Sequence, residues 1–256
     1  MERTYSLTAM CLRGYAIKEA DKILVLLSRE QGLKRVVAKG LRKPKSKIGG
    51  RLEPFRENMV MLAKGKNMDL VTQVDSLRAF KGPQADFEAM AAGMAASEVL
   101  MAFLEDEDPN PEAYDLYVDF LEALGPGVDA SLVLTAFELQ LMEILGYRPE
   151  LGQCLACDRE LSAPGDVHGL HVEAGGAICS HCEGLTGGRV RRLRPDTWQM
   201  LQALQETPLV AVNQLPVDDP TRAGCRMALK EYMSFRAERE LKAQGMFDWQ
   251  GAVTKV

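Results

Sequence analysis

Short runs of apolar residues alternate with turn-forming residues through the first 80 positions of the chain. Runs of this length, rich in Val, Ile and Leu and bounded by Gly, Asp, Asn or Pro, are typical of β-strands. The runs predict strands at residues 7–12, 23–27, 33–38, 55–62 and 70–74. So many short strands in so short a stretch indicate a small barrel, which buries one face of every strand.

The pattern changes after Pro83 to long segments rich in Ala, Leu, Met and Glu, which are strong helix formers. Turns that contain Pro or Gly at residues 108–111 and 125–127 interrupt these segments. The stretch 147–195 is rich in Gly, Cys and Arg without periodicity, which predicts a loop-like insertion. Helices are expected at residues 84–104, 112–124, 130–145, 196–205 and 221–244.

Two domains follow from these patterns, because 256 residues with an apolar fraction of 46% can bury two small cores. We predict an α+β multi-domain chain, with a five-stranded OB-fold β-barrel at residues 1–82 and an α-helical domain at residues 83–256 that carries the insertion 147–195. OB-folds commonly bind oligonucleotides, although the strand number also permits an SH3-like barrel. No stretch has the roughly 18 uninterrupted apolar residues of a membrane helix, so we expect a cytosolic protein.

The formal net charge of -5 hides a strong asymmetry between the two predicted domains. Residues 1–82 contain 18 Lys and Arg against 8 Asp and Glu, whereas the rest of the chain contains 13 basic and 28 acidic residues. A basic domain suggests a polyanionic partner, because each Lys or Arg that neutralises a phosphate releases counterions. A solvated basic surface without a ligand is the alternative.

The positive charge is concentrated in residues 34–51, which contain eight cations and no acid. Three Gly and one Pro predict a flexible loop there, and such a loop can follow a phosphate backbone without reading base sequence. Of the few aromatic residues that can stack on bases, we expect Tyr15 and Phe55 to pack in the core or in loops instead. The residues expected to bind DNA are Lys34, Arg35, Lys39, Arg42, Lys43, Lys45, Lys47 and Arg51.

The most specific chemical motif is a pair of CxxC knuckles, Cys154/Cys157 and Cys179/Cys182, separated by 21 residues. Each knuckle can offer two thiolates to one tetrahedral ion, so the motif predicts a structural zinc site. Four thiolates leave no coordination position for water, which argues for a role in folding rather than in catalysis. Two redox-active pairs are the alternative, although such a pair usually opens a helix within a βαβ unit.

The remaining histidines and cysteines lack a motif of this kind. Because four cysteines complete a tetrahedron, we expect His168, His171 and His181 to be solvent-exposed loop residues. Cys11 and Cys225 are expected to be small buried apolar residues. The sequence contains no phosphate-binding GxxxxGK[ST] loop, GxSxG elbow or HExxH motif, so it favours no class of enzyme.

Several short segments occur in a specific order along this chain. They are Asp-Lys-Ile at 21–23, Ala-Lys-Gly at 38–40, Pro-Lys-Ser at 44–46, Gly-Gly-Arg-Leu-Glu-Pro-Phe at 49–55, Phe-Glu-Leu at 137–139, Leu-Gly-Tyr-Arg-Pro at 145–149 and the knuckles that contain Cys154, Cys157, Cys179 and Cys182. In this combination the chain resembles the RecO family of bacterial recombination-mediator, DNA-repair proteins.

The resemblance implies an N-terminal OB-fold, a helical domain and a zinc knuckle. It also implies binding of single- and double-stranded DNA, annealing of complementary strands, and work with RecR and with the acidic C-terminal tail of single-strand-binding protein to load RecA recombinase. An acidic tail is not expected to dock on residues 83–150, which contain 15 acids and one base. The residues expected to receive the tail are Arg194, Arg226, Lys230 and Arg236. An adaptor whose barrel binds a protein, and touches DNA only incidentally, is the alternative function.

Overall fold

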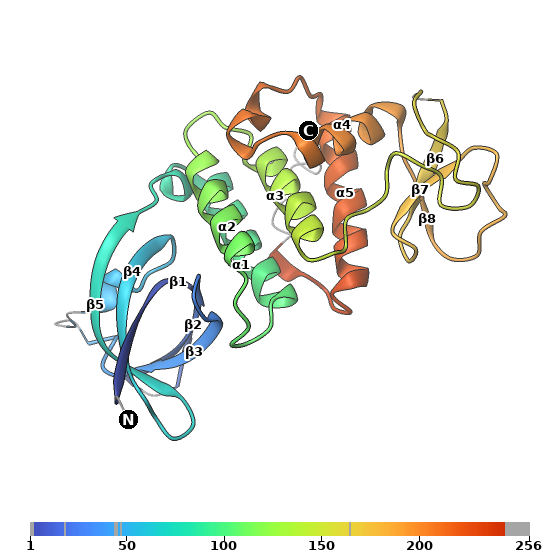
Figure 1. Cartoon of the computed structure of the whole chain (residues 1–256). Helices are drawn as coiled ribbons and strands as arrows, with labels where there is room; N and C mark the ends of the chain where they lie inside the picture. The colour runs from blue at the N-terminus through green and yellow to red at the C-terminus, as the bar shows by residue number, and fades with distance from the viewer. Residues whose placement is uncertain (1–2, 18, 44–45, 47, 164, 244–256) are drawn as a thin grey trace. The chain divides into compact units, whose positions relative to one another are not determined.

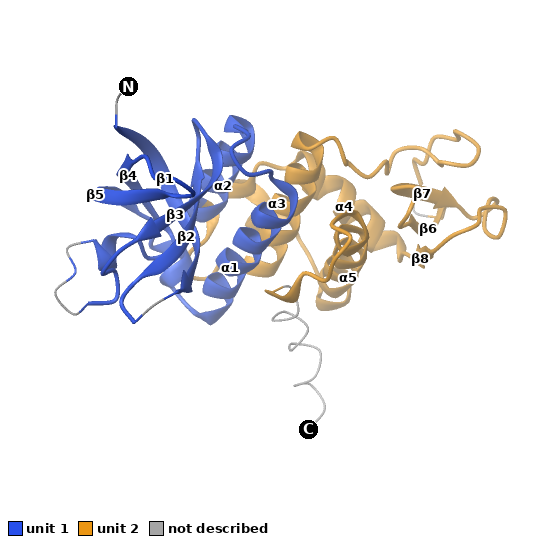
Figure 2. Ribbon diagram, turned by 90° about the horizontal axis from the view of Figure 1, so that it is seen from below, with its two compact units in different colours: residues 1–122 blue, residues 123–256 orange. Residues whose placement is uncertain are grey.

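The computed structural model describes residues 3–17, 19–43, 46, 48–163 and 165–243. Contacts divide the chain into two compact units, residues 1–122 and 123–256 (Figure 2). Unit 1 contains the barrel strands β1–β5 with helices α1 and α2, and unit 2 contains α3–α5 with strands β6–β8. Our domain boundary at residue 82, where strands give way to helices, stays a prediction. None of the helices in the described ranges is long and apolar enough to cross a membrane.

The N-terminal strands form a closed barrel with the order β1-β2-β3-β5-β4, in which β4 pairs with β1 (Figure 1). Strands β3 and β5 are parallel, and the other neighbours are antiparallel. This five-stranded barrel agrees with the predicted OB-fold, so the expected α+β fold class is confirmed. The strands are β1 (Thr4–Ala16), β2 (Lys22–Ser28), β3 (Gly32–Ala38), β4 (Arg56–Ala63) and β5 (Asp69–Ala79).

The barrel core comes from every second residue of its strands, as a two-residue period requires. Leu24 and Leu26 of β2 pack there with Val36 and Ala38 of β3. In β1 the register shifts between Cys11 and Arg13, so the alternation of apolar residues stops although the strand continues to Ala16. This bulge explains why the apolar pattern predicted only the first half of β1.

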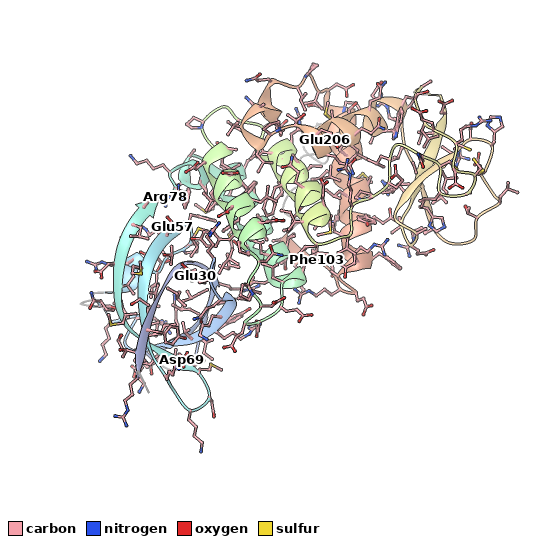
Figure 3. All side chains as sticks on the ribbon, viewed as in Figure 1. Glu30, Glu57, Asp69, Arg78, Phe103 and Glu206 are labelled. Carbon is pink, nitrogen blue, oxygen red and sulfur yellow. The ribbon has the colours of Figure 1, made fainter. Side chains whose placement is uncertain are left out.

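The end of β5 was also missed, because its side chains are exposed and carry no apolar pattern. It is a strand because β4 pairs with it, with Glu57 opposite Arg78. The Nε atom of Arg78 lies 3.1 Å from Glu57 Oε2, and Figure 3 shows both residues toward one end of the barrel, with Asp69 at the other. Backbone pairing with β4 therefore extends β5 without help from a core.

Helices α1 (Phe87–Phe103) and α2 (Pro111–Ala123) begin and end within three residues of the predicted limits. The carboxylate of Asp86 caps α1 by accepting a hydrogen bond from the backbone N–H of Ala89 at 2.8 Å. Phe55 packs against α1 at Gly93 and is buried as expected, with a positive φ of 62°. Only glycine leaves room for this ring, because a Cβ at position 93 would lie 2.6 Å from Phe55 Cε1.

Gly93→Ala is expected to destabilise unit 1 by about 1–3 kcal/mol, since the added methyl group overpacks the contact with Phe55. Urea unfolding of the full chain measures the change. Gly50→Ala is the matched control, because a Cβ at position 50 meets nothing within 4 Å. Equal stability of the two variants would contradict the packing argument.

In unit 2, helix α3 (Ala130–Ile144) is almost entirely buried and packs against α4 (Pro195–Glu206) and α5 (Asp219–Arg236) (Figure 1). Aspartates cap two of these helices: Asp129 accepts from the N–H of Leu132, and Asp218 accepts from that of Thr221. These helices agree with the prediction except that α5 ends at Arg236, well before residue 243, where the described part of the chain ends. Short 3₁₀ turns occur at Gly49–Arg51, Gly82–Gln84 and Leu209–Gln214.

The expectation of a purely loop-like insertion at 147–195 was wrong, because it contains a three-stranded antiparallel sheet of order β7-β6-β8. Its strands have three to five residues each, which is too short to show a period. Hydrogen bonds tie the start of the insertion to α4: the carbonyl of Leu151 accepts from Trp198 Nε1 at 2.9 Å and from Gln202 Nε2 at 3.1 Å. The strands are β6 (Val167–His171), β7 (Gly176–Cys179) and β8 (Val190–Arg192).

Candidate metal centre and nucleic-acid interface

The four knuckle cysteines come together as predicted, with all four sulfur atoms within 4.8 Å of one another. The Sγ atoms of Cys157 and Cys179 are 3.9 Å apart. Sulfur atoms placed 2.3 Å from a tetrahedral ion would be about 3.8 Å apart, so the spacing fits a single ion. Cys154, Cys179 and Cys182 are buried and Cys157 is exposed. The cluster can therefore hold one metal ion between two knuckles.

Each knuckle is a tight turn held by its own backbone. In the first, the N–H of Asp158 donates to the carbonyl of Cys154 at 2.9 Å, and Asp158 has a positive φ of 56°. In the second, which begins at the last residue of β7, the N–H of Cys182 donates to the carbonyl of Cys179 at 3.0 Å. The N–H of Cys179 also points at Cys154 Sγ, 3.3 Å away, which joins the two knuckles.

The thiols differ in acidity because they share one small volume. Burial by itself would raise the pKa of Cys154, but backbone N–H groups, that of Cys179 foremost, lower it to about 6. Hydrogen bonds with the neighbouring sulfurs, first that of Cys179, raise the pKa of Cys182 to about 12. One thiolate thus opposes ionisation of the next, and a cation bound among the four sulfurs would favour the ionised form of each thiol. A single four-thiol cluster fits metal binding better than two independent redox pairs.

The expectation of exposed histidines was wrong for His171, which is 7% exposed. Its Nδ1 accepts a hydrogen bond from the N–H of Ala174 at 3.2 Å, and its Nε2 lies 2.7 Å from the carbonyl of Gly187. These two contacts hold the imidazole against the loop before β8. His168 is only partly exposed, 3.1 Å from Glu183, whereas His181 is exposed as expected. Nothing in the sequence distinguishes the three.

The two cysteines outside the knuckles are buried, as predicted. Burial raises the pKa of Cys11 to about 12, and it raises that of Cys225 to the same range, about 12. Both side chains therefore remain protonated at neutral pH and act as apolar packing groups.

Lys34 lies apart from the other predicted DNA-binding residues, because its side chain points inward at one end of the barrel and is only 10% exposed. Its Nζ lies 2.8 Å from Glu107 Oε1 and 3.6 Å from Asp69 Oδ2. The same Nζ lies 5.6 Å from the centre of the Tyr5 ring. Two carboxylates already neutralise this lysine, so its place in the structure is that of a buried ion-pair partner.

Arg35 and Arg51 are half-exposed and paired with acids of unit 1. The Nε of Arg35 lies 2.8 Å from Asp106 Oδ2. Arg51 Nη1 lies 3.6 Å from Asp75 Oδ1 and also donates to the carbonyl of Val74. Exposed ion pairs of this kind are weak, so a phosphate can replace the carboxylate at either arginine.

Lys39, Arg42 and Lys43 are all exposed on the loop after β3. Backbone hydrogen bonds hold this loop against the turn between β1 and β2: the N–H of Arg42 donates to the carbonyl of Ala20 at 3.1 Å, and that of Gly40 donates to Asp21 Oδ1 at 2.8 Å. Arg42 and Lys43 are thus presented from a fixed place on the barrel. Lys45 and Lys47 lie outside the described residues.

The acidic residues between α1 and α2 have a role that sequence reasoning missed. Asp106 and Glu107 reach Arg35 and Lys34, and the N–H of Glu107 donates to the carbonyl of Leu33 at 2.7 Å. Residues 105–108 therefore lie along β3 and cover part of the predicted basic surface. The run of four acids was a visible signal, but its partner could not be read from the sequence.

The expectation that Tyr15 packs in the core or in a loop was wrong, because the side chain is 43% exposed. The guanidinium of Arg13 lies 5.3 Å from the centre of its ring. Arg13 was missed as a surface cation because it follows the bulge in β1. Both residues belong to the outer face of the barrel.

The four residues predicted to bind an acidic tail are not one surface. Arg226 is buried in α5 and pairs with Glu138 of α3, with its Nη1 2.5 Å from Glu138 Oε2 and its Nη2 3.2 Å from Glu138 Oε1. Lys230 and Arg236 are partly exposed on α5, and the Arg236 guanidinium lies 5.0 Å from the centre of the Tyr232 ring. Arg194 is exposed at the start of α4. Arg226 is therefore not part of a surface that a ligand can reach.

Comparison with known proteins assigns both parts of the chain to one family. The family model described as "Recombination protein O N terminal" matches residues 1–80, and that described as "Recombination protein O C terminal" matches residues 84–245. The DNA repair protein RecO of Roseiflexus sp. (strain RS-1) is 33% identical over 250 residues, which cover 96% of this chain and 86% of the relative. The DNA repair protein RecO of Pelotomaculum thermopropionicum is 31% identical over 246 residues, or 96% of this chain and 94% of that protein. The chain belongs to the RecO (recombination protein O) family.

Proposed function

We propose that this chain is a non-catalytic recombination mediator in DNA repair. It binds single- and double-stranded DNA, anneals complementary strands and helps to load a recombinase onto DNA covered by single-strand-binding protein. Membership of the RecO family supports the role in repair and recombination. The observation that carries DNA binding is the OB-fold barrel with Arg42 and Lys43 exposed on a braced loop. Its place of action would be the bacterial cytosol or nucleoid.

The proposed annealing of DNA strands depends on the positive charge of the barrel. Two DNA strands repel each other, and cations that contact the phosphates of both strands lower that repulsion without reading sequence. Arg42 and Lys43 contact phosphates first. Arg35 contacts a phosphate once that phosphate replaces Asp106 as its partner, and Arg51 does so once a phosphate replaces Asp75. Lys34 supports the barrel end instead. The proposed phosphate-binding residues are Arg35, Lys39, Arg42, Lys43, Lys45, Lys47 and Arg51.

Arg42→Glu/Lys43→Glu is expected to weaken binding to single- and double-stranded DNA alike. Loss of two phosphate contacts should reduce the slope of log affinity against log salt by roughly 2. Fluorescence anisotropy with labelled oligonucleotides at several salt concentrations measures affinity and slope together. Arg42→Lys/Lys43→Arg is the matched control, because it keeps both charges and should bind as the wild type does.

The same variants separate the proposal from the adaptor alternative. An adaptor whose barrel binds protein would keep its protein partners, and its affinity for them would change little, when these charges are reversed. If the wild-type protein binds DNA weakly and with no dependence on salt, the phosphate mechanism is wrong. If binding is salt-dependent but the Glu variant is unaffected, the DNA lies elsewhere on the chain.

We infer that the four-cysteine cluster binds Zn²⁺ in a structural role. Four thiolates suit zinc, and the sulfur separations described above match a tetrahedral site of closed coordination. When bound, the ion would supply charge that holds four thiolates together and would stabilise an insertion that lacks a large core. Cys154, Cys157, Cys179 and Cys182 would be its ligands.

Two protein partners complete the proposal: RecR and the acidic C-terminal tail of single-strand-binding protein. The exposed and partly exposed cations Arg194, Lys230 and Arg236 of unit 2 are the sites we propose for the tail, since carboxylates pair with such side chains. Arg226 contributes only by supporting α5 from within.

Charge reversal at Lys230 and Arg236 should weaken binding of an acidic peptide while zinc content stays unchanged.

A further inference from the structure

The outer face of β1, β2 and β3 carries a row of residues that the phosphate mechanism does not use. Tyr15 lies directly opposite Ile23 of β2, which in turn lies opposite Val37 of β3. Because Leu24 and Val36 point into the core, their neighbours Ile23 and Val37 point outward. Tyr15 shares that outward face, since directly paired residues in a sheet have side chains on the same side.

A second row on the same face carries two arginines. Arg13 lies opposite Val25, and Val25 lies opposite Arg35. The Arg13 guanidinium sits over the Tyr15 ring, as described above. Arg35 lies two residues before Val37 on β3, so its side chain shares the outward face of the first row. The exposed ring of Tyr15 thus shares one face of the sheet with two cations, and Arg13 lies over that ring.

The basic loop meets this face at the turn that joins β1 to β2. Tyr15 and Ile17, which is 44% exposed, precede that turn, and the backbone hydrogen bonds of Gly40 and Arg42 to Asp21 and Ala20 hold the loop against it. The loop that carries the cations proposed to bind phosphate therefore contacts the same turn that Tyr15 precedes. A strand bound along the loop would bring its bases toward Tyr15.

We propose that Tyr15 is a base-stacking residue that binds one unpaired base of a single-stranded nucleic acid, with Arg13 and Arg35 contacting the flanking phosphates. Stacking on an aromatic ring tolerates any base, because every base has a π-face. Within a duplex both faces of each base are covered by neighbouring base pairs, so the ring serves single strands only. This inference rests on the proposed DNA-binding function and adds to it a contact that distinguishes single strands from duplexes.

The test compares Tyr15→Leu with the wild-type full chain on three probes of equal length: oligo(dT), an oligonucleotide of abasic sites, and a duplex. The variant should bind oligo(dT) roughly 5- to 150-fold more weakly, as expected for loss of one stacked base. Both proteins should bind the abasic probe and the duplex equally, with the same salt slope. Tyr15→Phe keeps the ring and should bind oligo(dT) as the wild type does.

Phe87→Leu is the matched control, because Phe87 is an aromatic residue of unit 1 that is 68% exposed on α1. It should leave all three affinities unchanged. If Tyr15→Leu binds oligo(dT) as tightly as the wild type, or loses oligo(dT) and abasic probe to the same extent, the stacking proposal is overturned. If the wild type shows no salt-dependent binding to any probe, the proposed function itself fails, and that result is distinct from the other two.

Discussion

Cys154→Ser is expected to abolish zinc binding and to unfold the insertion that contains β6, β7 and β8, while the barrel of unit 1 stays folded. Structural zinc sites contribute apparent free energies of about 10–16 kcal/mol in small modules, far more than three short strands can supply by packing. Metal analysis should fall from one zinc per chain to none. Hydrogen exchange should show lost protection in residues 147–195 alone.

Cys225→Ala provides the control, since it removes a buried thiol that lies outside the cluster. This variant should keep one zinc per chain and normal protection of the insertion. The zinc proposal would be wrong if purified wild-type protein, prepared under reducing conditions and supplied with zinc, bound none. A thiol–disulfide exchange activity that depends on Cys157 would instead revive the redox alternative.

Glu138→Gln is expected to destabilise unit 2 by about 3–5 kcal/mol, because it removes the carboxylate that pairs with the buried guanidinium of Arg226. Both side chains are nearly inaccessible, at 6% exposure for Arg226 and 0% for Glu138. Urea unfolding followed by the fluorescence of Trp198, which is buried in α4, measures the change in this unit. The barrel should retain its own stability.

Glu138→Leu/Arg226→Met tests the cause of that loss. Replacing both charges by apolar side chains of similar size leaves neither member of the pair buried as a charge, so the double variant should be much more stable than Glu138→Gln. If the double variant is as unstable as the single one, packing around α3 matters more than charge. Burial raises the pKa of Glu138 and the guanidinium of Arg226 opposes that shift, which makes the pair a costly one to break.

The barrel and the helices were predictable because their information is local. Short apolar runs bounded by turn-forming residues mark β2, β3 and β4, and Pro and Gly mark the limits of α1, α2 and α3. The second half of β1 and the end of β5 have no apolar pattern, and they are strands because a neighbour pairs with their backbones. Pairing of this kind joins residues that are distant in sequence, so no local sequence pattern predicts it.

The metal site was predictable for a similar reason. The spacing of two residues within each CxxC pair sets the geometry of a knuckle, and two knuckles make one four-sulfur cluster. The sheet β7-β6-β8 around the cluster was not predictable, because its strands are short. The buried state of His171 also depends on two backbone groups that the fold brings to its ring.

The sequence by itself determined the order of elements, the cysteine cluster and the excess of positive charge in the first 82 residues. Only the tertiary structure decided which charges are available to a ligand. Lys34 and Arg226 are buried beside carboxylates, Arg35 is paired with Asp106, and Arg42 remains exposed. The reason is that a charge count depends on composition, whereas solvation and pairing depend on which distant residues the fold places within a few ångströms.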